Sequence, residues 1–189
     1  MFKKIFTTVI SLIFRPSIAW KELSEKRSED NEPFLSNYVY PFVGFVAMAA
    51  FIGILFSRKE FETQIALKSA ILAAMTVFGG FFLSSYLINE VWHSVFHRER
   101  NMKLCQCFVG YSSSLMFSLS IVLNLIPEFF FLRFLLLYTI YIVWEGAIPF
   151  MEVQEEEQLK FVSISTAIII LTPIIIEFAL KLLMPGLSF

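Results

Sequence analysis

The stretch LCQCFVGYSSSLMFSLSIVLNLIPEFFFLRFLLLYTIYIVWEGAIPFM, Leu104 to Met151, decides the fold. It carries no charged residue before Pro127, and after Pro127 and Glu128 it resumes as a second, mostly apolar run. About 20 apolar residues span the hydrocarbon core of a bilayer as a helix, and Pro followed by Glu suits a tight turn at the bilayer surface. The stretch therefore predicts two membrane crossings, over residues 105–127 and 129–151, with a very short connection.

The composition of the whole chain also indicates a membrane protein. Of its 189 residues, 57% are hydrophobic and only 16% are charged, whereas soluble domains are about 25% charged. The mean hydropathy is +0.71. The net charge of -1 gives no basic excess of the kind that indicates nucleic-acid binding. Cys105 and Cys107 are the only cysteines, and because they stand one residue apart they do not predict a disulfide scaffold.

Three further apolar runs predict three further crossings, over residues 34–57, 69–89 and 161–184. In the first of these, Ala49 and Gly53 form a pair of small residues four positions apart, which would let two helices approach closely. The same run supplies more small residues at Gly44, Ala47 and Ala50. We therefore expect an all-α integral membrane bundle of five transmembrane helices over residues 34–189.

Residues 1–33 form an N-terminal region of a different kind. Its first helical stretch is apolar on one side, at Phe2, Ile5, Phe6, Val9, Ile10, Ile13 and Phe14. This spacing predicts an amphipathic helix in the membrane interface, although a helix packed on the protein's own bundle would use the same face. Pro16 suits the start of a second short helix with Trp20 and Leu23 on its apolar side, and Ser24–Pro33 is a charged linker.

The distribution of Lys and Arg predicts the orientation in the membrane. With five crossings and a cytoplasmic N-terminus, ten basic residues lie on the cytoplasmic side: Lys3, Lys4, Arg15, Lys21, Lys26, Arg27, Arg98, Arg100, Lys103 and Lys160. Five lie on the opposite side: Arg58, Lys59, Lys68, Arg133 and Lys181. This bias predicts a cytoplasmic N-terminus and an outside C-terminus. The basic segment 97–103 and the acidic segment 151–160 would then share one face, where exposed pairs contribute about 0 to 1 kcal/mol each.

Several short motifs lie at characteristic places along this layout. They are Pro-Ser-Ile-Ala-Trp at Pro16–Trp20, a charged linker, Tyr-Pro at Tyr40 and Pro41, FVGYSSSL at Phe108–Leu115, and YIVWEG at Tyr141–Gly146. Together with five helices and a very short connection after the third, they resemble the Yip domain family (the Ypt-interacting-protein family) in its bacterial branch. The DLYGP-like motif of eukaryotic members does not occur in this sequence. For the bacterial members the resemblance implies a polytopic protein of the cell inner membrane with no established reaction.

A carboxylate and two imidazoles, those of Glu90, His93 and His97, lie close together in the sequence at the end of the second crossing. On one continuous helix they would fall within an arc of about 60°. Such groups are suitable ligands for zinc or iron, and Cys105 and Cys107 on the returning segment could add one more. The alternative is a solvated helix end at the membrane surface. We predict no tightly bound metal, because the sequence offers only generic partners to orient the imidazoles.

Two acidic residues, Glu145 and Glu177, lie within predicted crossings. An ionisable group costs about 2.5 to 3.5 kcal/mol or more at the bilayer centre, and it therefore usually faces the bundle interior or a cavity. Glu177 has Lys181 four residues on as a partner. Glu145 has no such partner in its own helix, and we expect it in the interior, either hydrogen-bonded or in a transport role. Tyr111 with the three serines after it, and Asn124, are residues that commonly hold membrane helices together.

Two classes of function remain. The first is a non-enzymatic protein that organises membrane lipids, partner membrane proteins or further copies of itself. The second is a small-solute or ion transporter, or a metal-dependent membrane enzyme, that uses Glu90, His93, His97 and Glu145. The sequence contains no nucleotide-binding motif, serine elbow or HExxH motif, and it indicates no cofactor. The first class is therefore favoured.

Overall fold

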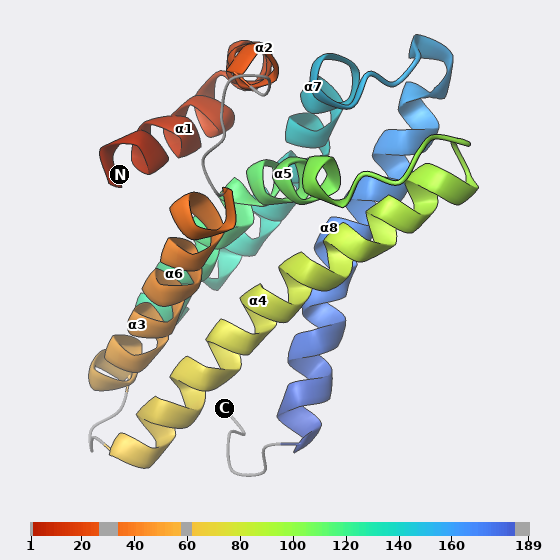
Figure 1. Cartoon of the computed structure of the whole chain (residues 1–189). Helices are drawn as coiled ribbons and strands as arrows, with labels where there is room; N and C mark the ends of the chain where they lie inside the picture. Colours follow the sequence, from red (N-terminus) through yellow and green to blue (C-terminus); the bar gives the residue numbers. More distant parts are fainter. Residues whose placement is uncertain (1, 27–33, 58–61, 184–189) are drawn as a thin grey trace.

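A computed structural model describes residues 2–26, 34–57 and 62–183 of the chain (Figure 1). Within these ranges most residues are helical and none forms a strand, which confirms an all-α membrane bundle. Four segments are long and apolar enough to cross a membrane, or up to five if one bent pair counts as a single span. The elements are α1 (Phe2–Phe14), α2 (Pro16–Lys26), a π-helical η1 (Leu35–Val39), α3 (Tyr40–Ser57), α4 (Thr63–Ser94), α5 (Met102–Ser112), α6 (Ser114–Leu125), a 3-10 helix η2 (Pro127–Tyr138), α7 (Thr139–Met151) and α8 (Glu155–Leu183).

The long helix α4 is the centre of the bundle, because it packs against α3 and α8. It extends beyond the predicted crossing 69–89 at both ends. At 1.5 Å per residue its 32 residues are about 48 Å long, whereas the hydrocarbon core is about 30 Å thick. Hence α4 must tilt in a membrane or project beyond its core. Helix α8 is also longer than predicted, since it begins at Glu155 rather than near residue 161.

The third predicted crossing, 105–127, is not one continuous helix. It is divided at Ser113 into α5 and α6, whose axes are bent by 47°. The break falls within three consecutive serines, and hydroxyl side chains compete with the helix by bonding to nearby backbone groups. Ser114 Oγ does so here by donating to the Tyr111 carbonyl oxygen. The predicted crossing over residues 105–127 contains these serines but includes no bend.

The fourth predicted crossing, 129–151, also differs from a regular α-helix. Helix α6 ends at Leu125, Ile126 is non-helical, and Pro127 begins the 3-10 helix η2, so the chain does turn at the predicted place. The first half of the segment is 3-10 helical and is kinked at Phe129, whose φ of -81° and ψ of 26° are non-helical, so it consists of shorter 3-10 pieces. Only from Thr139 does the segment continue as the α-helix α7. None of the residues of η2 is buried.

The N-terminal helices lie against the bundle rather than apart from it. The apolar face of α1 divides into two stripes: Ile5, Val9 and Leu12 are buried, whereas Phe6, Ile10 and Phe14 are exposed. Helix α1 contacts α5 and α6, and α2 contacts α7. The buried stripe packs on the protein's own bundle. The exposed stripe is available for contact with the membrane interface. The second helix begins at Pro16, as its missing N–H favours. Of the charged linker, residues 27–33 lie outside the described residues.

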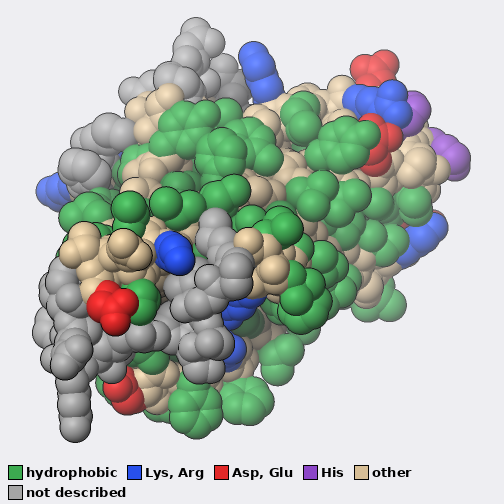
Figure 2. All heavy atoms as spheres, turned by 90° about the horizontal axis from the view of Figure 1, so that it is seen from below, with side chains coloured by type: hydrophobic (Ala, Val, Ile, Leu, Met, Phe, Trp, Pro, Cys, Tyr) green, Lys and Arg blue, Asp and Glu red, His purple; other side chains and the backbone are tan. Residues whose placement is uncertain are grey.

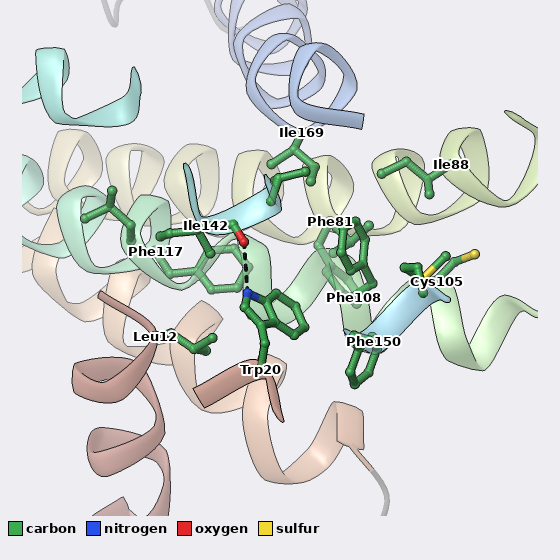
Figure 3. Packing of buried hydrophobic residues seen from close by; sticks show 14 of the residues in the cluster. Leu12, Trp20, Phe81, Ile88, Cys105, Phe108, Phe117, Ile142, Phe150 and Ile169 are labelled. Carbon is green, nitrogen blue, oxygen red and sulfur yellow. Dashed lines mark hydrogen bonds between the residues drawn. The ribbon is translucent and has the colours of Figure 1, made fainter. Parts of the chain in front are cut away.

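One hydrophobic core joins the N-terminal helices to the spans (Figure 3). Its largest fully buried side chains include Trp20 from α2, Phe108 from α5, Phe117 from α6, Phe150 from α7 and Phe161 from α8. Aromatic side chains therefore fill the space where the short helices α2, α5 and α7 meet. Such rings supply much buried area per residue and pack in offset or edge-to-face pairs.

Small residues allow close contact between α3 and α6. A Cβ added at Gly53 would lie 1.8 Å from the carbonyl oxygen of Asn124, so no other residue fits there without a shift of the backbone. Ala49 and Ala50 are buried on the same helix. By contrast, Gly44 has nothing within 4 Å of an added Cβ. The predicted contact at Ala49 and Gly53 therefore exists, and Gly44 takes no part in it.

The connections are distributed between two ends of the bundle (Figure 1). The N-terminal helices, the end of α4 and the start of α8 lie at the upper end of the view. The end of α3, the start of α4 and the end of α8 lie at the lower end. The two loops that the sequence analysis assigned to one face are thus on the same end as the N-terminus.

Candidate functional site

The most complete site in the structure is the one that holds Trp20. Its side chain is fully buried, and its indole Nε1 donates a hydrogen bond of 2.9 Å to the carbonyl oxygen of Ile142 in α7 (Figure 3). The ring packs against Phe108 and Phe150, with centroid separations of 5.5 and 5.1 Å. A buried indole N–H needs such an acceptor. The site fixes α2 onto the bundle.

The motif YIVWEG, Tyr141–Gly146 in α7, forms the side of this site against which the Trp20 ring packs. A Cβ at Gly146 would lie 2.5 Å from the indole Cε2 of Trp20, so only glycine lets the ring approach α7. In the sequence, Trp20 stands out by its place in the Pro16–Trp20 motif and on an apolar helix face, and YIVWEG stands out only as a family motif. Nothing in the sequence connects the two. The presence of one Trp in a short, partly charged helix could have indicated a buried anchor. The sequence does not show where the partner of that Trp lies.

A second cluster surrounds the break between α5 and α6. The Tyr38 hydroxyl and Ser114 Oγ are 2.6 Å apart and share a hydrogen bond. The Tyr111 ring lies 5.0 Å from both Phe34 and Tyr38 between centroids. Ser112 Oγ is buried, with no hydrogen-bond partner in the structure. These contacts join η1 and the residue before it to the bend, and the helix-joining role of Tyr111 and the serines stays a prediction.

The other polar residues named from the sequence within the spans have local partners. Asn124 Nδ2 donates to the carbonyl oxygen of Ser120, 2.7 Å away in the same helix. Lys181 Nζ lies 2.6 Å from Glu177 Oε1, and both side chains are about 40% exposed. The Glu177–Lys181 pair is therefore at the surface of α8, and neither group faces the bundle interior.

The candidate metal ligands Glu90, His93 and His97 do not share one helical stripe. Helix α4 ends at Ser94, and His97 has a left-handed backbone conformation with φ of 52°, so the assumed i+7 position is lost. Glu90 Oε2 instead accepts a hydrogen bond of 2.8 Å from Arg100. His93 Nδ1 lies 3.1 Å from the carbonyl oxygen of Arg98. Across the described ranges, no group of three or more His, Cys, Asp or Glu side chains could hold a metal ion.

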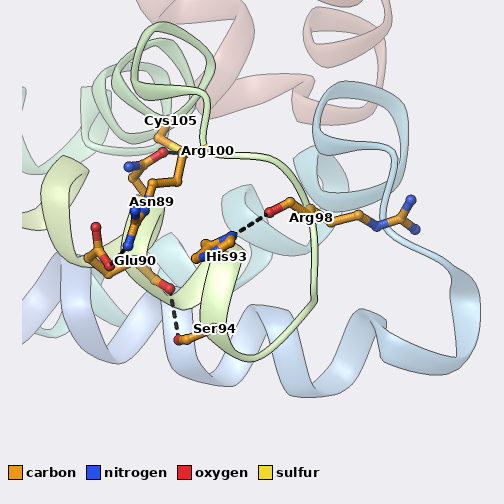
Figure 4. Close-up of polar contacts among 7 residues, drawn as sticks. All are labelled: Asn89, Glu90, His93, Ser94, Arg98, Arg100 and Cys105. Atoms are coloured by element: carbon orange, nitrogen blue, oxygen red, sulfur yellow. Dashed lines mark hydrogen bonds and ion pairs between the residues drawn. The ribbon is translucent and has the colours of Figure 1, made fainter.

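The two cysteines do not join this polar cluster. Cys105 is buried, and its Sγ lies 3.8 Å from Asn89 Oδ1, which belongs to the inner side of α4 (Figure 4). Within the described residues, neither cysteine forms a disulfide. The Glu90–Arg100 pair is solvent-accessible, so it contributes little to stability. The expectation that no metal binds tightly stays a prediction.

Next to the basic and acidic loops at this end, the residues just after α4 contact the start of α8 through an aromatic ring. Lys160 Nζ lies 5.7 Å from the centroid of the Phe96 ring. Phe96 in turn packs on Phe161, with ring centroids 5.5 Å apart. Figure 2 shows the histidines at one corner of the molecule beside acidic and basic side chains, while hydrophobic side chains cover much of the same view.

Glu145 occupies a different environment from the expected interior. It is half-buried and lines an open groove of about 650 Å³ on the outer side of η2 and α7. Tyr138, Tyr141 and Trp144 line the groove beside it, and Phe134 and Leu137 line the part formed by η2. In the part of the chain that the structure describes, no hydrogen bond or ion pair engages the Glu145 carboxylate. The interior position predicted for Glu145 is wrong, because residues on the other sides of α7 face α2, α5 and α8.

The fold and these sites define the class of protein: a multi-pass, all-helical membrane protein with N-terminal helices packed on its bundle. The chain matches the family model for the Yip1 domain over residues 10–176, which is most of its length, and it belongs to that family. No curated protein and no solved structure matches the chain.

Proposed function

We propose that this Yip1-domain protein is a non-enzymatic organiser of the membrane, which gathers lipids, partner membrane proteins or copies of itself. The observation that supports this best is the 12-residue segment η2, of which no residue is fully buried and only Leu132, Leu136 and Tyr138 pack against the hydrophobic core. Its side chains include Phe130, Phe131 and Phe134, which are 69%, 53% and 78% exposed. Apolar area of this extent is favourable only when lipid or another protein covers it.

The proposed location is a cell inner membrane, with the N-terminus cytoplasmic and the C-terminus outside. Support comes from the grouping of residues 2–26, residues 95–103 after α4 and the start of α8 at one end of the bundle, since these segments together carry nine of the 15 Lys and Arg residues. We further propose that residues 1–33 lie at the membrane interface on that side, with Phe6, Ile10 and Phe14 toward the lipid. Residues 34–189 then form the membrane domain proper.

The test is purification from native membranes in mild detergent, followed by analysis of bound lipids and co-purified proteins. We expect lipids or partners enriched relative to the bulk membrane. The variant Phe134→Ala with Leu137→Ala should reduce this enrichment. The matched control is Phe178→Ala with Leu182→Ala, because these side chains on α8 are exposed to a similar degree. A preparation with bulk lipid composition, no partner and no oligomer would contradict the proposal.

One observation supports a transport function as a second candidate. A broken span lined by hydroxyl groups occurs in many transporters, where it forms the binding site. Here the bend of 47° lies next to the buried, unpartnered Ser112 Oγ. Glu90 and Glu145, which the sequence suggested for transport, lie at a solvent-accessible pair and in an outer groove instead. Flux of small ions or solutes into proteoliposomes, lost in Ser112→Ala, would favour this candidate.

A further inference from the structure

The Glu145 carboxylate is unpaired within a segment long and apolar enough to cross a membrane. A charged group in such a position is costly unless another group compensates it. Glu177, an acidic residue in the apolar part of α8, has Lys181 at 2.6 Å. For Glu145, no described side chain supplies that cation. A ligand from outside the chain is therefore the simplest source.

The groove has a polar, aromatic part and an apolar part. Tyr141 and Trp144 are 42% and 39% exposed next to Glu145, and the Tyr138 and Tyr141 ring centroids are 5.4 Å apart. Phe134 and Leu137, on η2, continue the groove with apolar surface only. The aromatic rings and the carboxylate both attract a cation, through the ring faces and through charge. The remaining part fits a hydrocarbon chain.

The level of the groove in the bundle is fixed by contacts with the N-terminal helices. The Tyr138 hydroxyl donates a hydrogen bond of 2.9 Å to the carbonyl oxygen of Ile13 in α1. One turn further along, Ile142 accepts the hydrogen bond from Trp20. If α1 lies in the membrane interface, Glu145 is at the depth of lipid headgroups. This step rests on the proposed function, which places α1 there.

We propose that this groove binds a lipid with an alkylammonium headgroup. The ammonium group lies between the Glu145 carboxylate and the faces of Tyr141 and Trp144, and one acyl chain follows Phe134 and Leu137 along η2. An anionic lipid without an amine is disfavoured, because its headgroup would meet the carboxylate. The proposal names one site and one headgroup chemistry for the lipid-organising function.

The three tryptophans provide a readout. Trp20 and Trp92 are buried, with 0% and 6% of their surface exposed, whereas Trp144 lines the groove. Bromine atoms on a lipid acyl chain quench a tryptophan only in close contact, so quenching reports on Trp144. The full chain is reconstituted in phosphatidylglycerol vesicles that contain equal fractions of brominated phosphatidylethanolamine or of brominated phosphatidylglycerol.

We expect brominated phosphatidylethanolamine to occupy the site roughly twofold to tenfold more than brominated phosphatidylglycerol at the same fraction. Glu145→Gln should reduce that ratio to about one, because it removes the charge and keeps the shape. Glu177→Gln is the matched control and should leave the ratio unchanged. Brominated phosphatidylcholine, which carries a quaternary ammonium, should behave like the ethanolamine lipid.

Equal quenching by both lipids in the unmodified protein, or a preference that survives Glu145→Gln, would overturn the proposal. So would a partner protein whose co-purification depends on Glu145, since it would identify a protein cation as the occupant. Each of these results leaves the organising function intact. Loss of all enrichment in the native preparation would instead contradict that function, so the two failures are distinguishable.

Discussion

Trp20 and Ile142 are joined by a hydrogen bond of 2.9 Å that links the N-terminal region to the second half of the chain. Gly146 lies one turn beyond Ile142 and gives the indole ring its space. The same three residues belong to the two short motifs by which the sequence resembles its family. The two motifs therefore form the two sides of one contact. This contact explains the Trp in the first motif and the Gly in the second, which a membrane span alone would not require.

Trp20→Ala should destabilise the protein by roughly 3 to 5 kcal/mol, because a large buried ring is lost. Trp20→Phe keeps most of the packing and removes the hydrogen bond, so a loss of about 1 kcal/mol is expected. Thermal unfolding in detergent measures both. Trp144→Phe, at an exposed tryptophan, is the control and should have little effect. An equal effect of Trp144→Phe and Trp20→Ala would argue against the anchoring role of Trp20.

Gly53→Ala should separate α3 from α6, because the new methyl group would lie 1.8 Å from the Asn124 carbonyl oxygen. We expect a loss of at least about 1 to 3 kcal/mol, typical of overpacking. Gly44→Ala is the matched control on the same helix, where the methyl group meets nothing within 4 Å. It should be neutral or slightly stabilising, since alanine favours a helix. The comparison of the two unfolding temperatures tests the contact directly.

The two stripes of α1 should respond differently to added charge. Leu12→Asp places a carboxylate in the core and should destabilise the whole fold, as unfolding in detergent would show. Phe6→Asp with Phe14→Asp changes only exposed positions. This variant should fold normally but hold α1 further from the bilayer, which spin labels at Thr7 and Ser11 would detect as increased water access. Unchanged label accessibility would mean that the exposed stripe does not touch lipid.

A reporter fused after Phe189 should be located outside the cytoplasm, and a reporter inserted between Val153 and Gln154 should be located inside it. The second site follows from the structure, because α8 begins at Glu155 and an insertion further along would break its first turn. The ten-to-five distribution of basic residues is the physical reason for this orientation. The reverse pattern of reporter activity would refute the proposed topology.

Elemental analysis of the purified protein should show no stoichiometric zinc or iron. The arrangement at the end of α4 explains the expectation, since Arg100 engages Glu90 and His97 lies beyond the helix. The variant His93→Ala with His97→Ala should therefore have the same unfolding temperature as the unmodified protein in metal-free buffer. The two proteins should also have equal unfolding temperatures in buffer with zinc. About one metal ion per chain, removed by that double substitution, would show instead that the loop rearranges into a binding site.

The sequence was sufficient for the approximate place of the apolar segments, because hydropathy over some 20 residues is a local property. It also indicated the contact at Gly53, since pairs of small residues leave a visible pattern. It was not sufficient for the bend at Ser113 or for the 3-10 helix before Thr139. Both depend on how hydroxyl groups and neighbouring helices compete for the backbone, which no local pattern encodes.

For the candidate sites, too, the sequence was sufficient for local features and not for those that depend on distant contacts. The helix-stripe argument for Glu90, His93 and His97 failed where α4 ends, because a helix end at Ser94 carries no glycine or proline signal. The groove at Glu145 could not be predicted, since it depends on which side of α7 faces the bundle. Partners far away in the sequence, such as Trp20 on α2 and Phe108 on α5, decide that together with α8.

The contact between Trp20 and Ile142 also sets an order of events during synthesis. The acceptor is made 122 residues after the donor, and at ribosomal rates of about 5 to 20 residues per second that delay is on the order of ten seconds. Throughout this interval the Trp20 indole lacks its acceptor, although its ring partner Phe108 is made earlier. An apolar stripe on α1 that can lie at the membrane surface would keep the N-terminal helices next to the bundle during that time. The part of the protein that is made first thus completes its contacts only after α7 has been made.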